Sequence, residues 1–162
     1  MADRNLLDEN YGIVFDAKPD AVPYNYRISY KVSQLCLILH KCSRRGSSLI
    51  KLHMVSLALS SKNGMDRLKR FAESDSIANP VVLFDPAVNR AIIFAIADGF
   101  INQQKNGNYL LTDKGKGLIS AIENDDELMI SEKQELASLA KNLTETKVGD
   151  LSETWRKAYA QD

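Results

Sequence analysis

Four side chains in the first third of the chain are of the types that bind zinc. They are Cys36, His40, Cys42 and His53, and Cys36 lies one helical turn before His40. Zinc needs thiolates and imidazoles on one side of an element, as in a CxxC or HxxxH pair, and neither pair is present. Cys42 lies on another side of the same predicted helix. The pattern therefore favours buried thiols and ordinary helix histidines over a metal site.

The segment from Thr112 to Gly117, TDKGKG, combines glycines and lysines as phosphate-binding loops do. Its order differs from the G-x-x-x-x-G-K-[ST] pattern whose backbone wraps a phosphate, so nucleotide binding is not predicted. No serine stands in a nucleophile elbow, and the carboxylates show no pattern typical of a pocket. We therefore expect no catalytic residue, no metal and no cofactor. A free-standing hydrolase would need a polar pocket that the sequence does not indicate.

Basic residues gather in one part of a chain whose net charge is zero. From residue 27 to residue 70 the charge is +9, whereas residues 1–26 carry −3 and residues 71–162 carry −6. A basic segment can bind the phosphates of double-stranded DNA without reading its sequence, or it can be a solvated surface without a ligand. The candidates for contact with the DNA backbone are Arg44, Arg45, Lys51, Arg67, Lys69, Arg70 and Lys105.

The elements that would position these side chains are clearest in the stretch that starts at Asp85. Asp85 has the properties of an N-cap, Pro86 suits the first helical turn, and Gly99 ends a helix of about four turns. Residues 100–103 and 109–112 are predicted as two strands joined by an Asn-Gly turn, and another helix follows them. This order of helix, hairpin and helix is that of the second half of a winged-helix domain.

The rest of the chain is predicted to form an arm and further helices. In chain order, we expect an extended arm over residues 1–26, a buried helix over 26–42, and a helix over 49–59 capped by Ser47 or Ser48. A short basic helix over 65–71 and a candidate third strand over 80–84 follow. We then expect a helix whose capping box is Ser131 with Gln134, and a C-terminal helix through Val148, Leu151, Trp155 and Tyr159 with a candidate break at Gly149. The predicted fold is mainly α (α+β). It comprises a winged-helix domain over residues 27–124 with a two- or three-stranded sheet, the N-terminal arm over 1–26 and a C-terminal helical extension over 125–162.

The composition predicts a cytoplasmic protein. No apolar run approaches the length of a membrane span, and no basic-then-apolar leader follows Met1. Two cysteines that are so close in sequence do not make a secretory disulfide framework, so a reducing compartment fits better. We expect no contact with a membrane.

The helix that follows Asp85 would be the recognition helix of a DNA-binding winged helix, but its composition argues against that role. Base edges and phosphates are bound by Arg, Lys, Asn or Gln side chains, and this helix offers only Asn89 and Arg90. Its other residues are apolar or, as at Asp98, acidic. We therefore expect the helix to be packed inside the protein or pressed against another subunit.

Candidates for contact with a partner protein lie in three places. They are Tyr11 and Phe15 in the arm, Arg90 in the helix after Asp85, and Leu151 and Trp155 near the C-terminus. Trp155 is the one tryptophan of the chain. It either covers the core of this protein or anchors a partner, since tryptophan is a large apolar group and is enriched at interface hot spots.

Four stretches, YRISYKVSQLCLILHKC, SSLIKLHMVSLALSS, DPAVNRAIIFAIADGFI and NGNYLLTDKGKGLISAI, are followed by a capped helix and a tail that contains Trp155. Over residues 26–156 this series resembles the middle component of bacterial ABC-three-component defence systems, of the Lamassu type. The resemblance implies a small winged-helix adaptor without an active site. Such an adaptor bridges an SMC-like ABC ATPase, which binds the ATP, and an effector protein, commonly a nuclease, in an anti-phage or anti-plasmid complex that responds to foreign DNA.

A function of another class is a sequence-specific transcription regulator that binds DNA as a winged-helix dimer. A regulator should protect a defined duplex site and lose affinity when Asn89 or Arg90 is changed. The adaptor, by contrast, should bind DNA weakly when it is alone.

Overall fold

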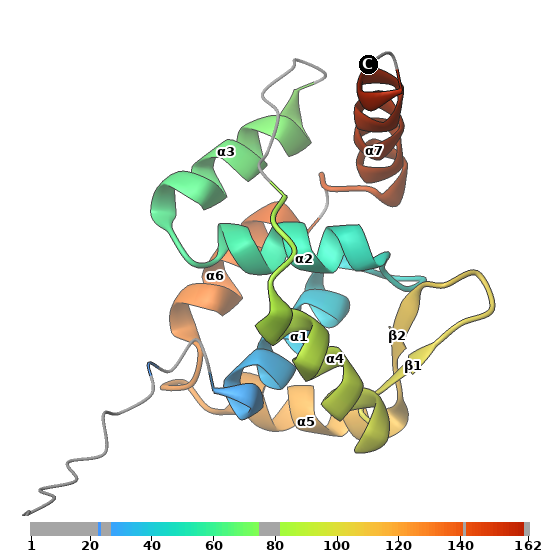
Figure 1. Cartoon of the computed structure of the whole chain (residues 1–162). Helices are drawn as coiled ribbons and strands as arrows, with labels where there is room; N and C mark the ends of the chain where they lie inside the picture. Colours follow the sequence, from blue (N-terminus) through green and yellow to red (C-terminus); the bar gives the residue numbers. More distant parts are fainter. Residues whose placement is uncertain (1–22, 24–26, 75–81, 141, 161–162) are drawn as a thin grey trace, which may run out of the picture.

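The structure is a computed structural model of the whole chain, and its described residues are 23, 27–74, 82–140 and 142–160. These residues form seven helices and one antiparallel sheet of two strands, so the fold is mainly α, as predicted (Figure 1). The elements are α1 (Ile28–Cys42), α2 (Leu49–Ala58), α3 (Lys62–Glu73), α4 (Pro86–Ala97), β1 (Ile101–Gln103), β2 (Tyr109–Leu111), α5 (Asp113–Asn124), α6 (Ile130–Leu139) and α7 (Glu145–Tyr159). Within the described ranges, no helix has the length and apolar character needed to cross a lipid bilayer.

Helix α1 lies at the centre of the molecule, with α4, α5 and α6 packed against it (Figure 1). Its residues 35–39, LCLIL, are at most 2% exposed. A helix that is apolar on every side is stable only when it is covered on every side, which explains why the other helices surround it. The predicted buried helix is therefore confirmed, with its first residue at Ile28.

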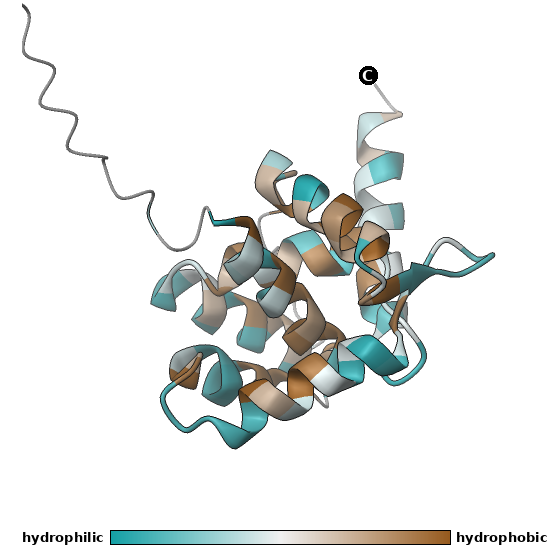
Figure 2. Cartoon of the chain, turned by 90° about the horizontal axis from the view of Figure 1, so that it is seen from below, coloured by the Kyte–Doolittle hydropathy of each residue, from teal (hydrophilic) through white to brown (hydrophobic). Residues whose placement is uncertain are grey.

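The C-terminal helices share this core. Leu136 of α6 and Val148 and Leu151 of α7 belong to the same cluster of buried side chains as the residues of α1. Helix α7 continues through Gly149, so the candidate break at that residue is wrong. Helix α3 is longer than the predicted basic helix over 65–71, because Ser61 caps it three residues before Gly64. The helices in the middle of the molecule carry the hydrophobic residues, whereas the hairpin turn is hydrophilic (Figure 2).

The sheet is a short hairpin with one additional partner residue. Strands β1 and β2 pair with Ile101 opposite Leu111, and Gly107 forms the turn with a φ of +85°. On the other edge of β2, Ser47 exchanges two backbone hydrogen bonds with Tyr109, at 2.9 and 2.8 Å. The predicted third strand over 80–84 is wrong for residues 82–84, which have no regular secondary structure, and 80 and 81 lie outside the described residues. Ser47 occupies the edge that such a strand would need.

The predicted N-caps at Ser48 and Asp85 are confirmed, and Thr112 caps α5 in the same way. Ser48, Asp85 and Thr112 each accept a hydrogen bond from a backbone N–H in the first turn of α2, α4 and α5. The capping box at Ser131 is wrong, because α6 already begins at Ile130 after Met129, whose φ is +49°. Ser131 is thus inside the first turn, where its side chain is not in the N-cap position.

Candidate interaction surface

Helix α4 is held in place by a buried histidine of α2. The backbone N–H of Asp85 donates to Nδ1 of His53 at 3.2 Å, and Nε2 of His53 lies 2.9 Å from Oδ1 of Asn89. Because Nδ1 accepts, the ring proton is on Nε2, and His53 donates to Asn89. The ring of Phe84 packs on the same imidazole at a centroid distance of 4.8 Å. The side chain of Asn89, a candidate for reading bases, is therefore engaged within the protein.

A buried lysine fastens the start of α4 to α1. Nζ of Lys31 lies 3.7 Å from the carboxylate of Asp85 and donates to Oγ of Ser56 at 3.1 Å. Ser56 in turn donates to Gln34 at 2.7 Å. Burial lowers the pKa of Lys31, and the negative charge of Asp85 offsets part of this effect by favouring the ammonium form. These contacts from α1 and α2 set which side of α4 faces outward.

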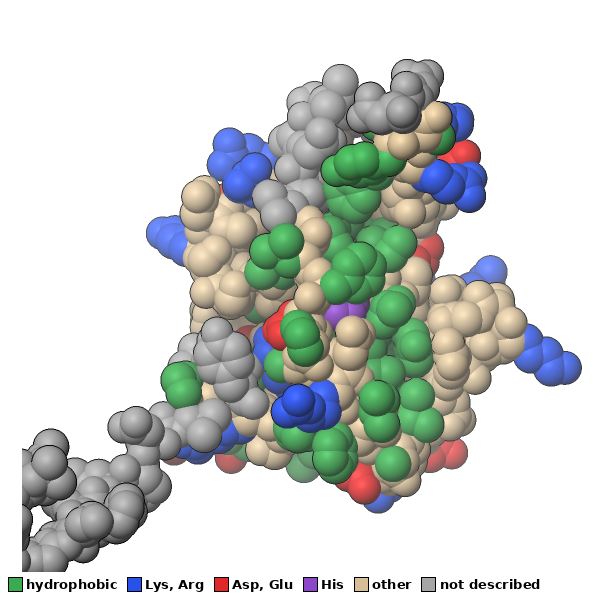
Figure 3. Space-filling view, in the orientation of Figure 1, with side chains coloured by type: hydrophobic (Ala, Val, Ile, Leu, Met, Phe, Trp, Pro, Cys, Tyr) green, Lys and Arg blue, Asp and Glu red, His purple; other side chains and the backbone are tan. Residues whose placement is uncertain are grey.

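The outward side of α4 is apolar. Val88, Ala91, Ile92 and Ala95 face the core, as their helical spacing requires. On the opposite side, Ile93 is 67% exposed, and the exposed hydrophobic residues of this region are Leu83, Phe84, Ile93, Phe94 and Ile96. We call these five residues and Arg90, which is also exposed, the α4 face (Figure 3).

The α4 face contradicts one of the two expectations for this helix, that it is packed inside the protein, whereas contact with another subunit stays a prediction. A helix that is apolar all round is normally covered on all sides, and here the described residues cover only one. An exposed cluster of large hydrophobic side chains is typical of a site where another molecule binds. The individual residues of the face, such as Ile93 and Phe94, were not among the sequence candidates. The sequence feature that could have indicated these residues is an apolar run in the helix that is too broad for a single buried face.

Two of the basic candidates are already paired within the protein. Lys51 is 1% exposed, and its Nζ donates to the backbone oxygen of Cys42 at 2.7 Å and lies 3.6 Å from the carboxylate of Glu145. Lys51 cannot reach a phosphate, so the prediction of DNA contact is wrong for this residue. Lys69 forms an ion pair with Glu135, which reduces the charge it offers to a ligand.

The exposed basic candidates lie in two separate places. Arg44 and Arg45 are in the turn after α1, and Lys105 is in the hairpin. The turn and the hairpin lie against each other, because a Cβ atom at Gly46 would meet Gln104 and Tyr109. The other two, on α3, are Arg67 and Arg70. Helix α3 and the hairpin are at opposite sides of the molecule (Figure 1). The predicted basic set therefore does not form one continuous patch.

The residues predicted to contact a partner protein lie in different environments in the structure. Tyr11 and Phe15 lie outside the described residues. Leu151 is buried against the core, so its prediction as a contact residue is wrong: α7 folds back on α2 and needs this side chain for its own packing. Trp155 is partly buried and packs on the same cluster, as the core-covering interpretation predicted. Arg90 is exposed on the α4 face.

The cysteines and histidines are not arranged as metal ligands. Burial raises the pKa of Cys36 to about 12 and that of Cys42 to about 11, so both thiols are protonated at neutral pH. In the part of the chain that the structure describes, no three side chains of the types His, Cys, Asp or Glu are grouped so that they could hold a metal ion.

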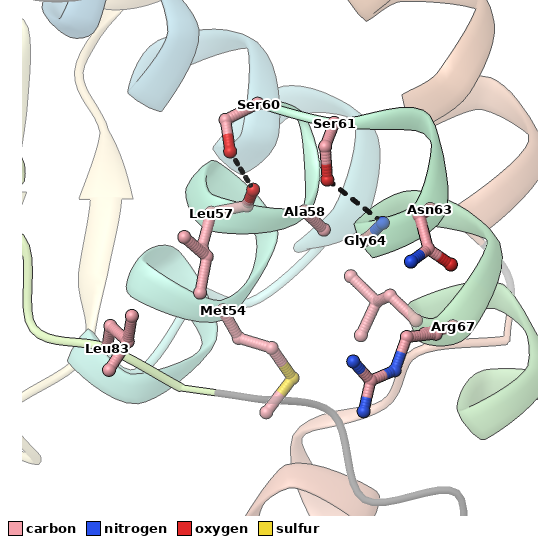
Figure 4. Close-up of a pocket in the computed structure, with 10 residues that line it drawn as sticks. Met54, Leu57, Ala58, Ser60, Ser61, Asn63, Gly64, Arg67 and Leu83 are labelled. Carbon is pink, nitrogen blue, oxygen red and sulfur yellow. Dashed lines mark hydrogen bonds between the residues drawn. The ribbon is translucent and has the colours of Figure 1, made fainter.

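A pocket of about 260 Å³ opens between α2 and α3 (Figure 4). Two of its polar side chains are used by the protein itself: Ser60 donates to the backbone oxygen of Leu57, and Ser61 accepts from the backbone N–H of Gly64. The apolar part of its lining includes Met54 and also Leu83, which belongs to the α4 face. The pocket therefore extends the apolar surface beyond α4.

Comparison of the chain with models of known protein families, with curated proteins and with solved structures identified no match.

Proposed function

We propose that this chain is a non-catalytic winged-helix adaptor in a bacterial complex that acts against phage or plasmid DNA. It would bridge an SMC-like ABC ATPase and an effector protein, commonly a nuclease, in the cytoplasm. The adaptor would work by protein contact, and its ATPase partner would bind the ATP.

The order of the elements supports a winged-helix interpretation. Helix α1 is followed by the bridge at Ser47, by α2, by α4 and then by the hairpin of β1 and β2. In a winged helix, a short first strand pairs with the hairpin, and the helix before the hairpin is the one presented to a ligand. In this interpretation Ser47 would take the place of the first strand and α4 that of the presented helix, with α3 inserted between α2 and α4.

The observation that carries the proposal is the apolar character of the α4 face. A helix that reads DNA presents several polar or cationic side chains to base edges and phosphates. Here Asn89 is bound to His53, and Arg90 is the one cation of the helix, among exposed residues such as Ile93 and Phe94. Burying such side chains against an apolar protein surface is favourable, whereas placing them against phosphates is not.

The test is a pull-down of the tagged chain from its native host with the neighbouring gene products expressed, followed by mass spectrometry. Recovery of a long coiled-coil ATPase together with an effector would support the adaptor function. Absence of an ATPase from the recovered complex, under conditions in which the tagged chain itself is folded and abundant, would contradict it.

The exposed arginines beside the hairpin favour a second, weaker contact. Arg44, Arg45 and Lys105 offer positive charge without a matching ion pair among the described residues. We expect weak, non-specific binding to double-stranded DNA that decreases steeply as salt is raised. Binding to one defined duplex site that is lost in Arg90→Ala would instead indicate the transcription regulator.

A further inference from the structure

A cleft larger than the pocket beside α3 lies between α1, β2 and α5. Its volume is about 670 Å³, and small-molecule sites in proteins have volumes of about 300–1,000 Å³. The three elements pack on one another. The ammonium of Lys41 lies 2.8 Å from the carboxylate of Glu123 and joins α1 to α5 beside the cleft. The cleft is therefore bounded by packed elements and not by loops alone.

The end of the cleft near β2 is cationic. Arg44 follows α1 and lies three residues before Ser47, which is bonded to β2, and Lys116 is in the first turn of α5, which follows β2 directly. Arg44 is exposed and forms no ion pair with another described residue. The pair of Lys116 with Asp113 is open to water and therefore weak. Both cations are thus free to bind an anion such as a phosphate group.

Two other residues of the lining favour a bound ligand. Glu123 is the one acid among the described residues that line the cleft, and Lys41 matches its charge, so it does not repel an anion. Ser43 lines the cleft with a buried hydroxyl that has no hydrogen-bond partner among the described residues. An unpaired buried hydroxyl is unfavourable. A polar ligand atom beside Ser43 would supply the missing partner.

The rest of the lining suits a flat organic group with polar edges. Ser120 and Asn124, one turn apart on α5, offer hydrogen-bond donors and acceptors. Asn124 is eight residues from Lys116, about 12 Å along the helix axis, so the hydrogen-bonding end and the cationic end are well separated. Between them lies an apolar floor of Leu39, Leu110, Leu111 and Ile119.

We infer that this cleft binds a nucleotide, with its phosphate at Arg44 and Lys116 and its base on the apolar floor beside Asn124. A bare phosphate would leave the floor unused, and an acyl chain would leave Asn124 unused, whereas a nucleotide uses both. Lys116 belongs to the segment 112–117, whose order is not that of a phosphate-binding loop; it contributes its ammonium group and not a backbone cradle. The inference goes beyond the proposed function and does not depend on it.

Isothermal titration calorimetry of the full chain with AMP, GMP, CMP and UMP tests the binding. At least one of them should bind with a Kd of about 10 μM to 1 mM. Inorganic phosphate and the matching nucleoside should each bind at least about tenfold more weakly, since each contacts only part of the lining. A single strand of about six nucleotides with a 5′ phosphate distinguishes the source of the nucleotide. Tighter binding of the strand assigns the cleft to the end of a nucleic acid, and weaker binding assigns it to a free nucleotide.

Charge variants test the location. Arg44→Glu and Lys116→Glu should each raise the Kd at least about tenfold, because a charged hydrogen bond to the phosphate is replaced by repulsion. Arg70→Glu makes the same charge change on α3, away from the cleft, and should leave the Kd unchanged. Asn124→Leu should reduce the differences in Kd among the four nucleotides, because it removes a group that reads the base. Circular dichroism spectra that match the wild type show that the variants fold.

Three results would overturn the inference. They are no binding of any of these nucleotides up to about 5 mM, binding of inorganic phosphate as tight as that of the nucleotides, and a Kd that Arg44→Glu and Lys116→Glu leave unchanged. The proposed function can fail separately. A chain that binds a nucleotide but recovers no ATPase from the host supports the cleft and contradicts the adaptor, and a chain that recovers the ATPase but binds no nucleotide does the reverse.

Discussion

Replacing Gly115 with alanine should destabilise the protein, whereas the same change at Gly117, two residues further along α5, should stabilise it. A Cβ atom at Gly115 would lie 2.1 Å from the backbone oxygen of Phe100 and 2.8 Å from Cδ2 of Leu111. No atom lies within 4 Å of a Cβ at Gly117, which is exposed. Both positions are helical, so the two variants differ in the space available and not in the element.

The expected magnitude follows from these distances. An ordinary contact of a Cβ atom begins at 3.4 Å, so the first turn of α5 must move away from Phe100 by more than an ångström in Gly115→Ala. Thr112, which caps α5, donates its backbone N–H to the Phe100 oxygen at 3.0 Å, whereas its hydroxyl is closer to the backbone oxygen of Gly99, at 2.5 Å. The movement therefore weakens the bond from the Thr112 N–H. Overpacking of this kind costs about 1–3 kcal/mol, the hydrogen bond about 1 kcal/mol, and alanine regains about 1 kcal/mol of helix propensity. The net loss should be about 1–3 kcal/mol.

The assay is urea denaturation of both variants, followed by far-ultraviolet circular dichroism and by the fluorescence of Trp155. Gly117→Ala should gain about 0.5–1 kcal/mol, because alanine restricts the unfolded chain more than glycine does. The two variants should therefore differ by about 2–4 kcal/mol, a large part of the stability of a domain of this size. A Gly115→Ala protein as stable as Gly117→Ala would refute the close approach of α5 to Phe100.

Two further predictions concern buried polar groups. Glu145→Gln should lower the free energy of unfolding by about 1–3 kcal/mol, because it leaves the buried ammonium of Lys51 without a counter-ion while the hydrogen bond to Cys42 remains. Thermal denaturation of this variant is compared with that of Glu153→Gln. The ion pair of Glu153 is exposed and lies on the same helix, so its loss should not change the denaturation midpoint. The thiols of Cys36 and Cys42 should not react with a thiol reagent at pH 8 unless urea is added, since burial keeps both protonated. Their pKa values are raised in the folded state, so the stability they contribute is complete below about pH 8.5, where the unfolded thiol titrates, and it is lost as the pH rises from there through about 11 to 12. A urea midpoint that rises between pH 9 and pH 11, or rapid labelling without urea, would contradict the burial of these thiols. Equal thermal midpoints for the two glutamine variants would show that Glu145 does not stabilise the buried Lys51.

The local elements could be predicted because their signals act over a few residues. An N-cap such as Asp85 bonds to a backbone N–H two residues later, and Gly107 supplies the positive φ of a hairpin turn. The misassigned start of α6 is also a local matter, since Met129 adopts a left-handed conformation that no sequence pattern announces. Gly115 and Gly117 look alike in the sequence, and only the backbone of Phe100 distinguishes them.

The assignment of individual side chains to surface or interior could be predicted less well. Lys51 belongs to a basic segment by sequence, yet it lies inside the protein because Glu145, 94 residues away, and the end of α1 surround its ammonium group. Leu151 has the helical spacing that would suit contact with a partner protein, yet it is buried because α7 packs against α2. Long-range contacts of this kind leave no periodic trace in the sequence.

The amino-acid sequence by itself determined the mainly helical composition, the hairpin after Gly99 and an apolar α4 with few polar groups, since propensity, capping and hydrophobic spacing are properties of neighbouring residues. Only the tertiary structure decided that Ser47 is the third partner of the sheet and that Lys51 is buried. It also decided that α4 turns Ile93 outward, because His53 and Lys31 hold the start of that helix in one orientation. The physical reason is that a helix can bury only the side for which another element of the chain is present.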